Sequence, residues 1–172
     1  MRYVFALIAT LLLAACSSQP PAPEQNPADV RDGAATKGVG GEPFDAYSIA
    51  GLKDPRSILS KRAIYFDYDQ YVVKDEFKPL VEAHAKFLVN NPSFKVLIQG
   101  NADERGSREY NLALGQKRAE AVKKALMLLG AREGQIESVS LGKEKPVCSE
   151  SNEECWAKNR RADILHSATK EF

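Results

Sequence analysis

Residues 100–119 read GNADERGSREYNLALGQKRA, and this stretch decides the fold. The glycine and the polar residues over 100–106 predict the end of a strand followed by a loop. Ser107 is a suitable N-cap, so a long helix is expected to run from there to Leu129, with Gly130 as its stop signal. A strand that leads through a short loop into a long helix fits a domain with both α and β layers.

The segments around this stretch complete the pattern. Short apolar or β-rich runs predict strands, and apolar residues at helical spacing predict a first helix whose first turn contains Pro79. The alternation of strands with two helices predicts a single two-layer α+β domain over residues 61–166. The expected strands are 63–66, 94–99, 136–141 and 162–165, and the expected first helix is 75–90.

Arg118 does not fit its surroundings in the second helix. At helical spacing it falls in the middle of an apolar face, whereas Lys117 falls on the opposite side. Such a charge must reach solvent or meet an anion, because an unpaired buried charge is very costly. Asp103 could be an internal partner, or the guanidinium could bind a ligand carboxylate, and both alternatives stay open. The apolar face consists of Tyr110, Leu114, Ala121, Val122, Ala125, Leu126 and Leu129.

The N-terminus carries the features of an export signal. Residues 4–13 are apolar with one exception, follow the cation Arg2, and are too few to span a bilayer as a mature helix. The sequence LAAC over residues 13–16 resembles the lipobox of bacterial lipoproteins. This resemblance implies that residues 1–15 are a signal peptide and that Cys16 becomes the acylated N-terminus. The alternative is an ordinary secretory signal followed by a chance cysteine.

A tether is expected between the lipid and the domain. Residues 16–43 contain five of the nine prolines and four glycines, a composition that predicts a flexible linker. Such a linker would span roughly 80 Å when extended. Residues 44–60 are expected to be an N-terminal extension of the domain with a helical turn or two, and residues 167–172 a frayed tail.

Charge and cysteine content narrow the function classes. Without Arg2, the exported chain carries 23 basic and 23 acidic side chains, which gives no electrostatic footprint for nucleic acid. Apart from Cys16 the chain has Cys148 and Cys155, and an even pair in an exported protein predicts a disulfide. The alternatives are two free thiols or half of a metal site, although no histidine lies near them in sequence.

Four ordered motifs resemble those of OmpA-like domains. They are YFDYD at 65–69, GNADERGS at 100–107, YNLALGQKRA at 110–119 and NRR at 159–161. Because these motifs follow one another over a whole domain, the resemblance is more specific than a single pattern. It implies the element order β-α-β-α-β-(short α)-β, with the helices packed on one face of a mixed sheet.

The same resemblance implies a binding site for peptidoglycan. In OmpA-like domains the matching aspartate and arginine grip the diaminopimelate residue of the stem peptide. Asp103 is therefore expected to bind the ammonium of that residue, and Arg118 its carboxylate. The remaining expected contacts are the apolar wall of Leu114 and Phe66, and hydrogen bonds from Asp67 and from the loop backbone, with Asn101, Ala102 and Arg105 as its contributing residues.

Together with the lipid signal, the resemblance implies a non-catalytic lipoprotein that ties the outer membrane to the cell wall. The expected partners are peptidoglycan, the periplasmic protein TolB and other Tol proteins, in a role in envelope integrity and cell division. Ser17 stands where lipoproteins kept in the inner membrane usually carry aspartate. An outer-membrane anchor with the domain facing the periplasm is therefore expected, without a cofactor or a metal.

A peptidoglycan hydrolase is the competing function. Glycan cleavage would need paired carboxylates, and amide cleavage a metal or a nucleophile with a base. The two histidines are His84, expected to be a hydrogen-bonded core residue with ligand binding as the alternative, and His166, near the end of the chain. Asp67 and Asp69 fit turn residues at a strand end, with metal ligation or recognition as alternatives. A third possibility is a flagellar-stator type of protein, which shares the domain. It needs a transmembrane helix, which the mature chain is expected to lack.

Overall fold

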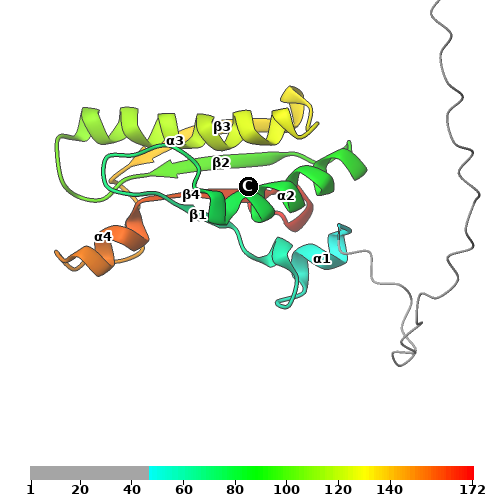
Figure 1. Ribbon diagram of the computed structural model, residues 1–172, viewed down its shortest axis with the longest axis horizontal. Coiled ribbons are helices and arrows are strands. Elements are labelled where there is room, and N and C mark those ends of the chain that lie inside the picture. The colour runs from blue at the N-terminus through cyan, green and yellow to red at the C-terminus, as the bar shows by residue number, and fades with distance from the viewer. Residues whose placement is uncertain (1–46) are drawn as a thin grey trace, which may run out of the picture. The chain divides into compact units, whose positions relative to one another are not determined.

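The computed structural model describes residues 47–172 (Figure 1). The predicted signal peptide, the lipidation site Cys16 and the tether of residues 16–43 lie outside the described residues. Within the described part, the chain forms the order of strands and helices that the sequence implies, and the α+β class is confirmed. Predicted element boundaries differ from the observed ones by a few residues.

Four strands of the described residues form one mixed sheet. They are β1 (Ala63–Tyr65), β2 (Val96–Asn101), β3 (Ile136–Gly142) and β4 (Arg161–His166). Their order across the sheet is β1-β4-β2-β3, where β2 and β3 are parallel and β4 is antiparallel to both of its neighbours. Consequently β1, β2 and β3 end at the edge of the sheet where β4 begins. This edge is called the pocket edge below.

Two longer helices cover one face of the sheet. They are α2 (Lys78–Asn90) and α3 (Arg108–Leu128), and α3 lies along β2 and β3 (Figure 1). The predicted first helix begins later than expected, because Asp75–Phe77 form a 3-10 helix and Pro79 occupies the first turn of α2. The short helices are α1 (Ile49–Lys53) and α4 (Glu153–Asn159), with further 3-10 helices at Ile58–Ser60, Glu133–Gln135 and Ser167–Thr169.

The ends of α3 follow the predicted capping residues. The Ser107 hydroxyl accepts a hydrogen bond of 3.1 Å from the Tyr110 backbone N–H, which satisfies a donor of the first turn. Gly130 follows the helix with a φ of +100°, a conformation that ends a helix at little cost only for glycine. Local sequence therefore sets both ends of the longest helix.

Two glycines allow α3 to lie directly on β2. A Cβ atom at Gly100 would stand 1.8 Å from the Gly115 carbonyl oxygen, and one at Gly115 would stand 2.3 Å from the Ser140 Oγ. No side chain fits between helix and strand at this point. The close approach also brings Arg118, one helical turn after Gly115, to the end of β2 at Asn101.

The core lies between the sheet and the two longer helices. Ile64, Ile98 and Ile164 from three strands are fully buried against Phe87 of α2 and Leu126 of α3. The segment before β1 adds to this core, because its side chains Leu52 and Leu59 are also buried. Transfer of these apolar side chains from water is the main stabilising contribution to the fold.

The C-terminal residues, expected to fray, are instead held by the sheet. The Glu171 carboxylate accepts hydrogen bonds of 2.6 Å from the His166 backbone N–H and from Arg62. The Ser167 hydroxyl accepts another, of 2.9 Å, from the Lys95 backbone N–H. The contacts with Arg62 and Lys95 join residues distant in sequence, so the polar tail alone gave no sign of them.

None of the helices formed by residues 47–172 is both long and apolar enough to cross a membrane.

Candidate functional site

A small cavity of about 120 Å³ opens at the pocket edge. It lies between the loop after β1, the loop after β2 and the first half of α3. Polar and charged side chains dominate its lining. The lining residues are Tyr68, Asp69, Asp103, Arg105, Gly106, Tyr110, Asn111, Leu114 and Arg118.

Arg118 lines this cavity although its surface is 0% exposed. Its Nε donates to the Gln70 carbonyl at 2.8 Å, its Nη1 to the Asn101 carbonyl at 2.8 Å and its Nη2 to the Asp67 carbonyl at 3.2 Å. The guanidinium also lies over the Phe66 ring, 5.2 Å from the centroid. The arginine is thus held by backbone dipoles and a ring face.

No carboxylate among residues 47–172 forms an ion pair with Arg118. The internal pair with Asp103 that the sequence allowed is not formed. Burial lowers the pKa of Arg118 to about 10, and the negative charge of Asp103 nearby offsets only part of this effect. The guanidinium is therefore charged at neutral pH, buried, and without an anionic partner within the described structure.

Asp103 has two arginine partners of its own. Its carboxylate accepts hydrogen bonds from the Arg105 Nη2 at 2.7 Å, the Arg105 Nε at 3.2 Å and the Arg160 Nη1 at 3.4 Å. Burial acts to raise the pKa of the Asp103 carboxyl, but the hydrogen bonds from Arg105 and Arg160 outweigh it and hold that pKa below its usual value. Asp103 is therefore charged at neutral pH.

The loops around the cavity are tied to α3. The Tyr110 hydroxyl hydrogen-bonds to the Asp69 carboxylate, and the Asn111 side chain donates to the Arg105 carbonyl at 2.8 Å. Asp69 adopts a φ of +56°, which aspartate tolerates better than most residues. These contacts fix the mouth of the cavity between the loop after β1 and the helix.

Only four of the eight predicted ligand contacts line the cavity. These are Asp103, Arg105, Leu114 and Arg118. The Asp67 carboxylate, expected to face the ligand, lies outside the cavity and pairs with Lys74 at 3.3 Å.

The other predicted contacts support Arg118 or the sheet. Phe66, expected in the apolar wall, is buried beneath Arg118, and Ala102 donates its backbone N–H to Gly142 at 2.8 Å. The Asn101 backbone carbonyl, from the segment expected to bind ligand, accepts from Arg118, and its side chain donates to the Gln99 carbonyl and to Asp163. A register shift between Gly100 and Asn101 at the end of β2 accompanies this orientation.

Sequence reasoning missed several residues of the site. Tyr110 lies on the same helical face as Leu114 and Arg118, so its place at the cavity could have been inferred from the helical spacing. Arg160 and Trp156 could not, because they reach the site from more than 50 positions away in sequence. Asp69 is predicted as a turn residue, with recognition only as an alternative. The residues that were given no role at the site are Tyr68, Gly106, Tyr110, Asn111, Glu153, Trp156 and Arg160.

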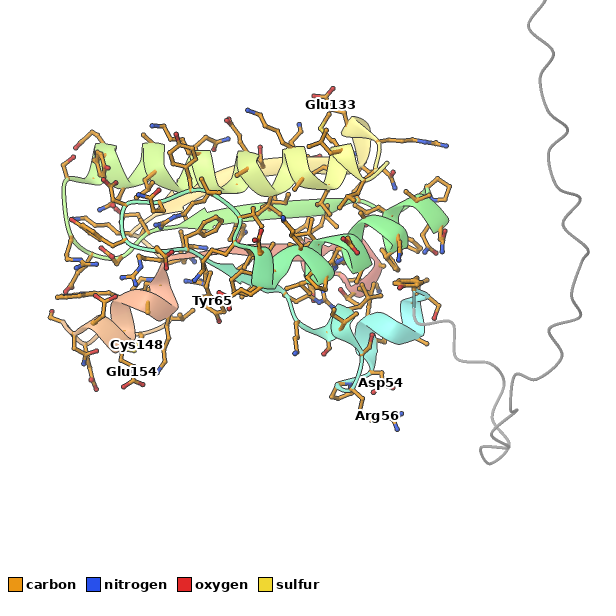
Figure 2. All side chains as sticks on the ribbon, viewed as in Figure 1. Asp54, Arg56, Tyr65, Glu133, Cys148 and Glu154 are labelled. Atoms are coloured by element: carbon orange, nitrogen blue, oxygen red, sulfur yellow. A yellow bond between two sulfur atoms is a disulfide. The ribbon has the colours of Figure 1, made fainter. Side chains whose placement is uncertain are left out.

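The segment before β4 carries a disulfide. Cys148 and Cys155 are bonded to each other, with their Cα atoms 5.0 Å apart, and Cys155 belongs to α4. Figure 2 shows Cys148 beside α4, at the same end of the domain as the loop between β2 and α3. The Asn159 side chain also donates to the Cys148 carbonyl at 2.7 Å. The disulfide thus closes a short loop beside the pocket edge.

The two histidines lie together at the opposite end of β4, here called the histidine edge. His84 Nδ1 and His166 Nε2 are 2.9 Å apart, and His84 Nε2 lies 2.9 Å from the Lys61 carbonyl oxygen. Both side chains are fully buried. His84 is therefore a hydrogen-bonded core residue, and neither histidine lines the cavity. Residues 47–172 contain no cluster of three or more His, Cys, Asp or Glu side chains suited to a metal.

Known proteins are similar to this chain in sequence and in fold. Residues 65–160 match the OmpA family. The chain is 43% identical over 126 residues to the peptidoglycan-associated lipoprotein of Pasteurella multocida, covering 73% of this chain and 81% of that protein. It is 41% identical over 154 residues to the peptidoglycan-associated lipoprotein of Haemophilus influenzae, covering 90% of each.

Solved structures give the same result. The crystal structure of the peptidoglycan-associated lipoprotein from Burkholderia pseudomallei is 57% identical with a TM-score of 0.66, covering 67% of this chain and 98% of that chain. The C-terminal domain of Helicobacter pylori MotB is 21% identical with a TM-score of 0.57, covering 62% of this chain and 84% of that chain. The second likeness concerns the fold alone.

Proposed function

The chain belongs to the OmpA family, among the peptidoglycan-associated lipoproteins, and from this premise we propose that its cavity binds the diaminopimelate side chain of peptidoglycan. The protein then acts without catalysis, as a lipoprotein that holds the cell wall from the outer membrane. The names of its relatives support a lipoprotein associated with peptidoglycan. The binding of diaminopimelate is argued from the cavity.

One observation carries the proposal: Arg118 is charged, buried and without an anionic partner among the described residues, yet lines an open cavity. An uncompensated buried charge is costly, and three carbonyl dipoles replace only part of the solvation that it has lost. A ligand carboxylate would supply the missing charge. The planar guanidinium suits such a ligand because it can form parallel hydrogen bonds to both oxygens.

Two carboxylates line the same cavity as Arg118. Asp69 and Asp103 both line it, so a ligand ammonium can meet carboxylate oxygens while its carboxylate meets Arg118. The far end of diaminopimelate carries both groups on one carbon atom. Lysine, which replaces diaminopimelate in some cell walls, has the ammonium but lacks the carboxylate. The charge pattern therefore selects the zwitterion.

The size of the cavity limits what can enter. The cavity has a volume of only about 120 Å³. An amino group and a carboxylate on one carbon atom are small enough to enter it, whereas a whole stem peptide is not. The tip of the side chain would enter, and the rest of the stem peptide would lie across the mouth beside Tyr68 and Tyr110, which are 60% and 51% exposed.

The cellular role follows from two attachment points. We infer that Cys16 carries the lipid that anchors the protein in the outer membrane, and that residues 16–43 span the gap to the domain. TolB and other Tol proteins are the partners that the resemblance implies, with functions in envelope integrity and division. Cys148 and Cys155 contribute a structural disulfide and no redox step.

A pelleting assay tests the proposal. The mature chain with Cys16→Ser, which carries no lipid, is incubated with purified peptidoglycan that contains diaminopimelate, and the insoluble fraction is collected. The protein is expected in the pellet, and no muropeptides are expected in solution. Release of muropeptides would favour the hydrolase over a binding module, and absence of the protein from the pellet would contradict peptidoglycan binding itself.

A further inference from the structure

Arg105 is more tightly held than an arginine in a surface loop usually is. Its guanidinium lies between two aromatic rings, 4.2 Å from the centroid of Tyr68 and 4.1 Å from that of Trp156. Its edge donates to Asp103, and its Nη1 lies 3.8 Å from Glu153. The side chain is nevertheless 30% exposed. Ordering so long a side chain costs rotamer entropy, which the stacking on both faces offsets.

Trp156 reaches Arg105 from α4, the short helix beside the pocket edge. Its Nε1 donates to the Glu104 carboxylate at 2.9 Å, which fixes the ring over the loop after β2. From the same helix, Glu153 binds Arg160 at 2.6 Å, and Arg160 in turn contacts Asp103. Thus α4 contacts both arginines that hold the Asp103 carboxylate.

α4 is too short to be stable without other contacts. It has seven residues, whereas isolated helices below about 12 residues are marginal in water. The Cys148–Cys155 disulfide joins it to the preceding loop, and the Asn159 side chain binds the backbone of Val147 and Cys148 at its other end. The Asn152 side chain caps the first turn at 2.9 Å. Residues 147–159 therefore form one unit, in which the disulfide closes residues 148–155 and hydrogen bonds of Asn159 hold the rest.

Trp156 does not line the cavity, although it contacts a residue that does. An effect of Trp156 on a ligand in the cavity therefore passes through the residues it contacts in the loop after β2, which are Arg105 and Glu104. It is also the single tryptophan of the chain, so its spectroscopic signals need no assignment.

We propose that α4, closed by the Cys148–Cys155 disulfide, is a clasp that positions Arg105 against Asp103, with Trp156 as the positioning residue. The inference rests on the proposed function, because Arg105 and Asp103 form one wall of the same ligand site. A preorganised wall binds more tightly than one that must be ordered when the ligand arrives. The clasp thus sets the affinity of the site from outside it.

Two substitutions separate stacking from packing. Trp156→Leu keeps an apolar side chain in place but removes the aromatic face, whereas Trp156→Phe retains a ring. Lys158→Ala, on the same helix, is the matched control, because Lys158 is exposed and pairs only with Glu154. All are made in the mature chain with Cys16→Ser and checked for an intact disulfide and unchanged circular dichroism.

The first readout needs no ligand: the pKa of the Asp103 carboxyl is measured by carbon NMR. The cations that face it are Arg105 from its own loop, Arg160 before β4 and Arg118 of α3. The nearby anions are Glu104, which Trp156 holds, and Glu153 of α4, which lies behind Arg105 and Arg160. Trp156→Leu is expected to raise that pKa towards the ordinary value, since the hydrogen bonds from Arg105 are then made only part of the time. Trp156→Phe and Lys158→Ala are expected to leave it unchanged.

The second readout is the affinity for a soluble stem tripeptide that contains diaminopimelate, measured by calorimetry. Trp156→Leu is expected to weaken binding about tenfold, with Trp156→Phe within about threefold of wild type. An unchanged Asp103 pKa in Trp156→Leu would overturn the clasp, and so would unchanged or tighter binding, since tighter binding would mean that Arg105 blocks the site. Failure of the wild-type protein to bind would contradict the proposed function instead, and the pKa would still judge the clasp.

Discussion

The two ends of β4 treat buried ionisable side chains in opposite ways. At the pocket edge Arg118 is fully buried and remains charged, with its pKa lowered by burial only to about 10. At the histidine edge, burial lowers the pKa of His84 to about 4 and that of His166 to about 2, so both rings are neutral at pH 7. The fold keeps the buried charge of Arg118 at an end where that side chain lines a cavity that could admit a counter-charge.

The hydrogen bonds of the histidine edge are those of two neutral rings. Because a carbonyl oxygen only accepts, the proton of His84 is assigned to Nε2, which donates to Lys61. His84 Nδ1 is then an acceptor, and His166 Nε2 donates to it. His166 Nδ1 is left buried without a partner among the described residues. This pair satisfies most of its hydrogen bonds without any ligand, which is how a structural site differs from a binding site.

Removing the charge at the pocket edge should have the largest effect. Arg118→Gln is expected to weaken binding of the diaminopimelate tripeptide at least about a hundredfold, because the ligand carboxylate loses its only buried cationic partner. Calorimetric titration measures the loss. The matched control is Lys117→Gln at the neighbouring exposed position, which should bind like wild type. A folded Arg118→Gln protein with wild-type affinity would contradict the role given to Arg118.

Lowering the pH should destabilise the protein through the histidine edge. Since the folded-state pKa of His84 is depressed, the unfolded chain takes up protons more readily, and stability is lost as the pH falls from about 6.5 towards 4. His84 alone should lower the free energy of unfolding on the order of 3 kcal/mol over this range. Urea unfolding at several pH values measures the slope.

Histidine variants provide the check on that slope. Replacing the pair by His84→Gln and His166→Gln should flatten the dependence on pH between 6.5 and 4, whatever the substitutions do to stability at pH 7.5. A slope equal to that of wild type would mean that carboxylates, and not the histidine edge, cause the acid sensitivity.

A side chain introduced at the contact between α3 and β2 should lower the stability of the fold. Gly115→Ala is expected to lower the free energy of unfolding by about 2 kcal/mol, because the new methyl group would meet the Gly100 carbonyl at 2.7 Å as well as Ser140. Gly134→Ala is the control, since a Cβ atom there meets nothing within 4 Å. Denaturant unfolding of both variants should separate them clearly, and equal stabilities would show that the helix can move away from the strand.

The smallest effect concerns Asp67. The sequence motif predicts a ligand contact, whereas its carboxylate lies outside the cavity in an exposed pair with Lys74. Asp67→Asn is therefore expected to change the tripeptide affinity less than about twofold, in keeping with the low value of exposed ion pairs. A tenfold loss in the same titration would favour the motif over the structure.

Sequence reasoning reached the fold and half of the site. Helical spacing identified α3 and showed Arg118 as the misplaced charge, because both depend on neighbours within one helix. The carbonyl partners of Arg118 come from the loop after β1 and from the end of β2, and a backbone group leaves no mark in the residue types. The sequence predicts Asn101 in the loop, whereas it is the last residue of β2, after a register shift that cannot be read from alternation of residue types.

Long-range contacts account for the rest. Trp156 and Arg160 reach the pocket edge through α4, and Glu171 reaches Arg62 across more than 100 positions. Such contacts require the strand order, which the sequence pattern did not supply. The motif resemblance predicted Asp103 as a site residue. Its ion pairs with Arg105 and Arg160 are seen only in the structure.

The most direct test of the account compares two ligands on one protein. Stem tripeptides that end in diaminopimelate or in lysine differ by the single carboxylate that Arg118 is proposed to bind. The wild-type protein is expected to bind the diaminopimelate peptide at least about a hundredfold more tightly in calorimetric titration, because the lysine peptide leaves the buried guanidinium without an anion. Equal affinity for the two peptides would contradict the proposed role of Arg118.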